Sequence, residues 1–248
     1  TEHPVLHHAI AELLNAAGQP IDRKQVTFGF RTAEFRADGF YLNGKKTFLR
    51  GLNRHQSYPY IGYAAPESLQ REDARILQEE LHCTAVRTSH YPDDPYFLQL
   101  CDEYGLYVIG ETNLETHGTW QKLGADGSDE WTLPGARPEW RENVLARAEA
   151  MLERDKNHPA ILIWSCGNES HGGKTLWEMS EYFRRTDPRR LVHYEGIFWN
   201  REYPATSDME SQMYTPVADI KKFLACLLYT SPEPTRLRCI SYAVFCLK

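Results

Sequence analysis

The stretch Ile161–Gly173, which reads ILIWSCGNESHGG, decides the fold. It begins with an apolar run, Ile161–Trp164, continues through small and polar residues, and reaches a carboxylate at Glu169. A short apolar run bounded by glycine is typical of a buried strand. Parallel α/β sheets place their chemistry just past the carboxyl ends of such strands. By itself the stretch leaves two roles open for Glu169: an active-site carboxylate, or a cap of the next helix.

Bulk composition excludes several classes of protein. The chain has 248 residues, 42% of them hydrophobic, which suits a globular domain with a sizeable core. A net charge of −6 argues against a nucleic-acid partner. No segment has the length and apolarity of a membrane span, and the first 20 residues lack the pattern of a signal peptide. Six cysteines without a C-x-x-C pair indicate reduced thiols and a cytoplasmic protein.

The first 30 residues differ in pattern from the rest. Leu6–Leu14 and Gln25–Phe30 are strand-like, and Asn15–Gly18 between them supplies turn residues. We therefore expect the closing hairpin of a small β domain. A helix over His7–Ala16 is the alternative, because alanine and leucine favour it.

From Thr32 onward, strands and helices alternate. Asn43-Gly44 predicts a hairpin, and helices are expected over 66–81, 95–104, 138–155, 175–185 and 216–224. Strands are expected near residues 48, 86, 108, 162, 193 and 212. This alternation predicts βαβ units and a parallel sheet. The favoured fold is a (β/α)8 barrel lacking its last two units. An open doubly wound sheet is the alternative, which the absence of a glycine-rich phosphate loop disfavours.

Polar side chains follow each of these expected strands. In a barrel, residues at the carboxyl ends of the strands converge on one face, where barrel enzymes build their sites. The residues concerned are Asn53, Arg54, His55, Arg87, His90, Tyr91, Glu111, Asn113, Glu115, His117, Asn168, Glu169, Glu195 and Tyr214. Polar groups from so many successive strands indicate an active site.

The chemistry available is that of carboxylates, imidazoles, amides and aromatic rings. Neither a G-x-S-x-G elbow nor an H-E-x-x-H motif is present, and Cys166 falls within a buried strand, as a packed thiol does. Two carboxylates, one with a raised pKa, are what glycoside hydrolysis requires. Glu115 and His117 would suit a cation such as Mg²⁺ together with Glu169. The alternative is that Glu115 and His117 only form hydrogen bonds within their loop.

Several long stretches resemble the central barrel of glycoside hydrolase family 2, specifically its β-galactosidases. They are LNGKKTFLRGLNRHQSYP (42–59), AVRTSHYPDDPYFLQLCDEYGLYVIGETNLETHG (85–118), RDKNHPAILIWSCGNES (154–170), DPRRLVHYEG (187–196) and QMYTP (212–216). The resemblance implies a TIM (β/α)8-type barrel over residues 31–225, cut after about six units. It also implies that residues 1–30 are the end of an immunoglobulin-like β-sandwich domain.

The resemblance implies a role for each matching residue. Glu169 corresponds to the general acid/base, and Asn168 to the partner of the sugar's 2-hydroxyl. Glu115, His117 and Glu169 correspond to ligands of an active-site Mg²⁺, and the full-length family also uses Na⁺. The remaining substrate-binding residues would be His55, His90, Arg87 and Tyr214. His55 and His90 would line the sugar subsite, Arg87 would support them, and Tyr214 would contact the nucleophile.

The activity implied is retaining hydrolysis of terminal β-D-galactosides such as lactose, by a homo-oligomeric protein of carbohydrate metabolism. Ser170 and Glu115–Gly118 favour a galactoside over a glucuronide, because β-glucuronidases usually have proline after the catalytic glutamate and lack the ETHG element. The sequence is also compatible with β-glucuronidase or β-mannosidase activity, and with a non-catalytic sugar-binding relic of the barrel.

The family's nucleophile, a glutamate in a Cys-Glu-Tyr-type motif, has no counterpart in the sequence. Residues 226–248 depart from the family pattern; Glu233 lies there between two prolines, and neither Glu195 nor Glu210 matches the motif. We interpret 226–248 as a tail foreign to the family, produced by a frameshift or joining error. The isolated chain is therefore expected to be poorly soluble and inactive.

Overall fold

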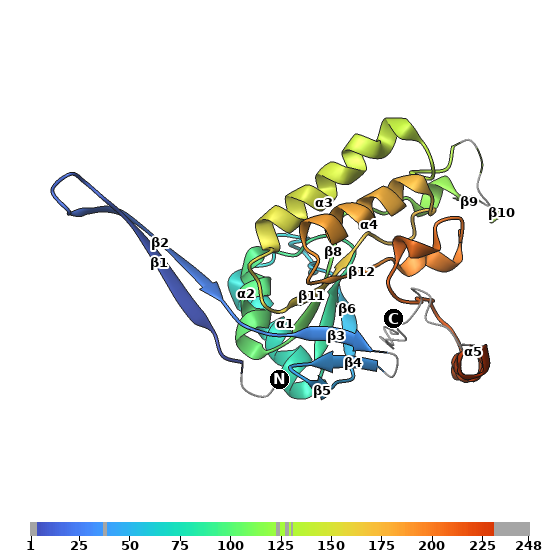
Figure 1. The fold of residues 1–248 in the computed structure, drawn as a ribbon, viewed down its shortest axis with the longest axis horizontal. Helices are drawn as coiled ribbons and strands as arrows, with labels where there is room; N and C mark the ends of the chain where they lie inside the picture. The colour runs from blue at the N-terminus through green and yellow to red at the C-terminus, as the bar shows by residue number, and fades with distance from the viewer. Residues whose placement is uncertain (1–3, 37–38, 123–124, 127–128, 130, 231–248) are drawn as a thin grey trace.

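The centre of the molecule is a parallel sheet of five strands. The structure, a computed structural model, describes residues 4–36, 39–122, 125–126, 129 and 131–230 (Figure 1). Its sheet has the order β12-β11-β8-β7-β6, so that neighbouring strands follow one another along the chain. A doubly wound sheet reverses its order part of the way across, whereas a barrel does not. The strands are β6 (Gly51–Arg54), β7 (Ala85–Thr88), β8 (Tyr107–Glu111), β11 (Ile161–Ser165) and β12 (Leu191–His193).

Helices connect these strands close to the predicted positions. The clearest example is α2, where the Asp94 carboxylate accepts the N–H of Tyr96 at 2.8 Å, Pro95 occupies the first turn, and Gly105 ends the helix at φ 73°. None of the described helices is both long and apolar enough to span a membrane. The helices are α1 (Glu67–Arg75, continued by a π-helical turn over Ile76–Glu80), α2 (Pro95–Tyr104), α3 (Arg141–Asp155, preceded by a 3-10 turn over Pro138–Trp140), α4 (Lys174–Thr186) and α5 (Val217–Thr230).

The two faces of the sheet belong to two apolar cores. Val86, Val108 and Trp164 join the larger core, which the helices share with the sheet, and α3 and α4 lie side by side in it (Figure 1). Ala85 and Ile109, their neighbours along the strands, belong to the second core. This alternation follows from the period of two residues in a strand. The hairpin of β3 (Ala33–Arg36), β4 (Gly39–Leu42) and β5 (Lys45–Lys46) contributes to the second core.

The structure corrects two of the strand predictions. The first barrel strand is β6, a few residues later than the position near 48, because Leu49 is buried in the second core instead of joining the sheet. The strand expected near 212 is wrong: Ser211–Tyr214 is irregular. The chain does approach β12, since Asp208 N donates to Val192 O at 2.8 Å. Tyr214, however, has a φ of 54°, which is incompatible with a strand.

The first strands form a long hairpin that extends away from the barrel (Figure 1). β1 (His7–Leu14) and β2 (Pro20–Phe28) pair antiparallel, so the predicted hairpin is confirmed and the alternative helix is wrong. The Asn15 side chain accepts the N–H of Ala17 at 2.9 Å and thereby fixes the turn. That this hairpin of β1 and β2 belongs to an immunoglobulin-like domain stays a prediction. Most of the proposed foreign tail, residues 231–248, lies outside the described residues.

Candidate active site

A buried polar network joins the carboxyl ends of the sheet strands. Its centre is Glu111, the last residue of β8, which is fully buried. One Glu111 oxygen accepts from Arg87 Nε at 2.5 Å and from Ser165 Oγ at 2.7 Å, and the other contacts His90 Nδ1 at 2.7 Å. Ser165 Oγ also lies 2.9 Å from His193 Nδ1. Four strands or strand ends are therefore tied together at the face where barrel enzymes place their chemistry.

Electrostatics determine the charges in this network. Burial alone would raise the pKa of Glu111, but Arg87 and His90 outweigh that effect and lower the pKa to about 2. Glu111 is therefore ionised at neutral pH. Burial lowers the pKa of His193 to about 3, so that imidazole is neutral. Because Glu111 occupies His90 Nδ1, the Nε2 atom of His90 is left for other partners.

His55 and His90 lie together beside this network. Their ring centroids are 5.2 Å apart and nearly perpendicular, and Tyr91 lies 6.1 Å from His55. Burial, followed by the nearby His90, lowers the pKa of His55. Arg87 Nη2 donates to Asn168 Oδ1 at 3.1 Å, which links this group to the chain just before Glu169.

Glu169 lies in the irregular segment after β11. The helix that follows, α4, has Gly173 as its N-cap, so Glu169 does not cap it. Its main-chain N–H donates to Glu195 Oε1 at 2.5 Å, and its carbonyl oxygen accepts from Trp120 Nε1 at 2.9 Å. Its φ of 38° lies in the left-handed region. Burial raises the pKa of Glu195 to about 7.

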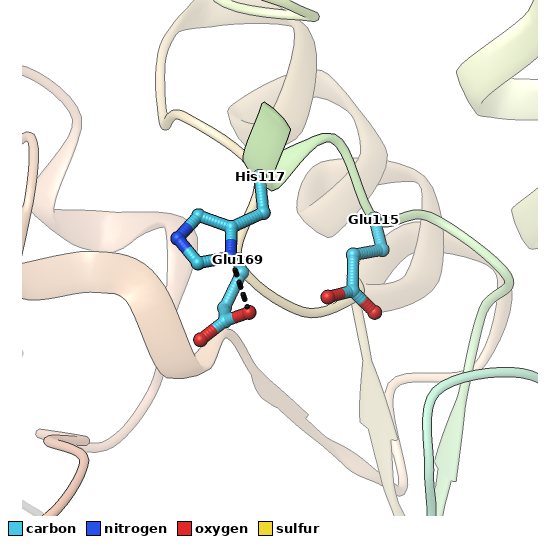
Figure 2. A group of neighbouring side chains, drawn as sticks. All are labelled: Glu115, His117 and Glu169. Carbon is cyan, nitrogen blue, oxygen red and sulfur yellow. Dashed lines mark ion pairs between the residues drawn. The ribbon is translucent and has the colours of Figure 1, made fainter. Parts of the chain in front are cut away.

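Glu115, His117 and Glu169 form the group that resembles a cation site. Figure 2 shows the imidazole of His117 beside the carboxylate of Glu169, with the Glu115 carboxylate pointing into the same region. One ligand atom from each lies within 4.8 Å of the others, and His117 Nδ1 is 3.0 Å from Glu169 Oε2. Burial and a hydrogen bond with Glu169, outweighing the opposing charge of His90, raise the pKa of Glu115. Two carboxylates and one imidazole facing one point fit a divalent cation.

A close approach of two loops holds this group together. Glu115 and Asn168 form an isolated parallel bridge, and Asn168 N donates to Leu114 O at 2.9 Å. Gly167 makes the approach sterically feasible. A Cβ atom there would lie 2.5 Å from the Leu114 carbonyl oxygen, and its φ of 133° is unfavourable for any other residue.

The variant Gly167→Ala is therefore expected to destabilise the protein by about 2 kcal/mol and to separate Glu169 from Glu115. Thermal melting of the complete protein measures the loss. Gly118→Ala is the matched control, since a Cβ atom at Gly118 meets nothing within 4 Å. Equal melting temperatures for the two variants would show that the loops can move apart without cost.

The structure brings together seven of the eight residues assigned from the sequence. Tyr214 is the exception: the residue is 70% exposed, and among the described residues no hydrogen bond or ring contact joins it to the others. The seven residues are His55, Arg87, His90, Glu115, His117, Asn168 and Glu169. Their individual roles stay predictions.

Three further residues contact the site without having been assigned a role from the sequence. Glu111 and Glu195 end or follow buried strands, and that position was the available signal for them. Trp120 lies in the long loop after β8 and carries no such signal. Its ring is 5.1 Å from His117 and 4.9 Å from Trp199, which makes it part of an aromatic cluster.

Comparison with known proteins shows which family the chain belongs to. Residues 33–239 match the TIM barrel domain of glycosyl hydrolases family 2. A beta-galactosidase of Priestia megaterium is 48% identical over 225 residues, which is 90% of this chain and 21% of the relative. The chain thus spans about a fifth of that protein's length.

Two solved structures share the fold. A beta-glycosidase from Bacteroides vulgatus is 27% identical with a TM-score of 0.69, over 89% of this chain and 27% of the other. Bacteroides uniformis beta-glucuronidase, 22% identical, has a TM-score of 0.76 over 93% and 29% of the two chains. These matches confirm the predicted partial (β/α)8 barrel. The chain belongs to glycosyl hydrolases family 2 and carries part of the TIM barrel domain of that family.

Proposed function

We propose that the complete protein is a retaining β-galactosidase that removes terminal, non-reducing β-D-galactosyl groups from substrates such as lactose. The observation that carries the proposal is the group of Glu115, His117 and Glu169, whose ligand atoms lie within 4.8 Å of one another at the carboxyl end of the sheet. The 48% identity to a protein named beta-galactosidase supports the choice of sugar. We further propose a cytoplasmic, homo-oligomeric protein of carbohydrate metabolism.

Glu169 is the proposed general acid/base. In a retaining reaction one carboxyl group protonates the leaving oxygen, while a second attacks the anomeric carbon; the first then activates water. Asn168, held by Arg87, is proposed to bind the 2-hydroxyl of the sugar. His55 and His90 are proposed to line the sugar subsite, with His90 Nε2 free to meet a hydroxyl because Nδ1 contacts Glu111.

Glu111 is a poor candidate for the nucleophile. Both of its oxygens are occupied by Arg87, Ser165 and His90, and it is fully buried. Because no residue of the sequence stands in a Cys-Glu-Tyr-type motif, we propose that residues 1–248 by themselves do not complete the covalent step.

A panel of nitrophenyl β-glycosides tests the choice of substrate. We expect the complete protein to hydrolyse the β-galactoside with a kcat/KM at least about tenfold above that for the β-glucuronide or β-mannoside, and to release galactose first as the β-anomer. Residues 1–248 alone are the control and should be inactive. A preference for the glucuronide would replace the galactosidase proposal. Sugar binding without turnover by the complete protein would support a non-catalytic relic.

Glu115, His117 and Glu169 are proposed to hold Mg²⁺, with Na⁺ bound elsewhere in the complete protein. A bound divalent cation would supply positive charge that stabilises the ionised form of the acid/base. The residues themselves fix two carboxylates and one imidazole at one point. Since the pKa of Glu115 is raised, protons compete with the cation there as the pH falls.

Removal of one ligand should therefore weaken Mg²⁺ binding. For Glu115→Gln we expect the affinity for Mg²⁺ to fall at least about tenfold, and for the wild type we expect the affinity to decrease from pH 8 toward pH 5. Titration calorimetry on the metal-stripped complete protein measures both effects. Glu103→Gln, on the exposed side of α2, is the control. Unchanged affinity in Glu115→Gln would leave the loop hydrogen bonds as the role of Glu115.

A further inference from the structure

We propose that Glu195 and Trp120 are positioning residues that set the carboxyl group of Glu169 for proton transfer. This inference rests on the role proposed above for Glu169. We call the two side chains the main-chain clamp, because the carboxyl group of Glu195 holds the N–H of Glu169 and the indole of Trp120 holds its carbonyl oxygen.

The first observation is that side chains satisfy both main-chain groups of Glu169. Its N–H donates to Glu195 Oε1 at 2.5 Å, and its carbonyl oxygen accepts from Trp120 Nε1 at 2.9 Å. In a strand or a helix these groups would bond to other backbone. Glu169 lies beyond the end of β11 at Ser165, so the clamp supplies the hydrogen bonds that a strand would receive from its neighbours.

The second observation is that Glu169 needs such support. Its φ of 38° lies in the left-handed region, which costs a non-glycine residue about 1 kcal/mol. The rotamers open to a side chain depend on its φ and ψ. A relaxed backbone at Glu169 would therefore redirect the carboxyl group, and misplacement by about 1 Å is enough to lower a rate about 100-fold.

The third observation is the setting of Glu195. The residue is 1% exposed, and its Oε2 atom has no hydrogen-bond partner among the described residues. Burying a carboxyl group costs free energy unless hydrogen bonds compensate. The bond from the N–H of Glu169 is the direct hydrogen bond found for this side chain in the described part of the chain. That bond explains the placement of Glu195 better than packing does.

The other half of the clamp is equally fixed. Trp120 is 3% exposed, and its ring packs between His117, at 5.1 Å, and Trp199, at 4.9 Å. Burial and these ring contacts restrict rotation of the indole and so keep its N–H group directed at Glu169. Glu195 comes from the turn after β12, and Trp120 comes from the loop after β8. These strands lie on either side of β11, so the clamp positions Glu169 relative to both neighbours of its own strand.

A misplaced general acid leaves a specific kinetic signature. Proton donation matters greatly when the leaving group is basic, as in lactose, and little when it is a strongly acidic phenol. A residue that only supports the fold would lower kcat/KM for both substrates by the same factor. The ratio of the two values therefore separates positioning from general structural damage.

The experiment compares the complete wild-type protein with Glu195→Ala, Glu195→Gln and Trp120→Phe, using lactose and dinitrophenyl β-galactoside. We expect Glu195→Ala to lose about 100-fold in kcat/KM for lactose and less than about threefold for the dinitrophenyl substrate. Glu195→Gln should retain most activity, because its amide oxygen accepts the same N–H. Trp120→Phe keeps an aromatic ring but loses the N–H donor, and should show the same selective loss, of about tenfold. Glu210→Gln, which alters a carboxyl group paired with Arg201, is the matched control.

Equal losses on both substrates would overturn the inference, and so would a Glu195→Gln variant as impaired as Glu195→Ala. If Glu195→Ala fails to fold, Trp120→Phe decides the question. If the wild type hydrolyses a different β-glycoside, the proposed substrate is wrong, and the same pair of leaving groups on that glycoside still tests the clamp.

Discussion

Replacing Glu169 by alanine in the complete protein is expected to lower kcat/KM for lactose by about 10²–10⁴-fold. The variant removes the carboxyl group proposed to protonate the leaving oxygen, while Glu195 and Trp120 still hold the main chain. The kcat/KM for a dinitrophenyl galactoside should decrease far less, because that leaving group departs without a proton. The alkaline limb of the pH profile of kcat/KM, which reports the general acid, should disappear.

Azide provides the second measurement on Glu169→Ala. The galactosyl-enzyme formed from an activated substrate is hydrolysed slowly, because no base activates the attacking water. A small anion such as azide can enter the space left by the carboxyl group and attack the anomeric carbon instead. We expect added azide to accelerate turnover of the dinitrophenyl substrate and to form β-galactosyl azide, with retention of configuration. Glu181→Ala, on the outer part of α4, is the control and should show neither effect. The absence of azide product in Glu169→Ala, or equal losses on both substrates, would contradict the acid/base role.

The barrel and much of its site follow from local sequence patterns. Buried runs such as Ile161–Trp164 indicate strands, because a parallel strand is apolar on both faces. The residues that follow each run in the sequence must then lie at the carboxyl end of that strand. Asn43-Gly44 determines its hairpin through the positive φ that both residues adopt. For the same reason, most residues assigned from strand ends lie together in the structure.

The rest depends on contacts that no local pattern encodes. Leu49 packs with Phe40 in the second core without pairing in the sheet, so the first strand was expected a few residues too early. Tyr214 was expected in a strand, but the chain is irregular there. The contacts of Glu169 with Trp120 and Glu195 join residues 49 and 26 positions apart, and a hydrogen bond at such separation has no periodic signal.

Glu111→Gln is expected to destabilise the complete protein by about 3 kcal/mol at pH 7, because it leaves the buried Arg87 without its counter-ion. The folded-state pKa of Glu111 is about 2, against an ordinary value of 4.5. A carboxyl group with a lowered pKa contributes stability that is present above pH 4.5 and lost as the pH falls through about 2. The difference corresponds to about 3 kcal/mol.

The sign of this pH dependence makes the prediction for Glu111→Gln specific. Melting temperatures of the wild type and of Glu111→Gln should be well separated at pH 7 and should converge as the pH decreases from 4.5 toward 2, since the wild-type carboxylate then takes up a proton and comes to resemble the amide. Glu103→Gln, at an exposed position of α2, should run parallel to the wild type throughout. A separation between wild type and Glu111→Gln that stays constant with pH would mean that the hydrogen-bond acceptors of Glu111, and not its charge, are what the residue contributes. Convergence would instead show that Glu111 stabilises the protein through its negative charge, beside Arg87 and His90.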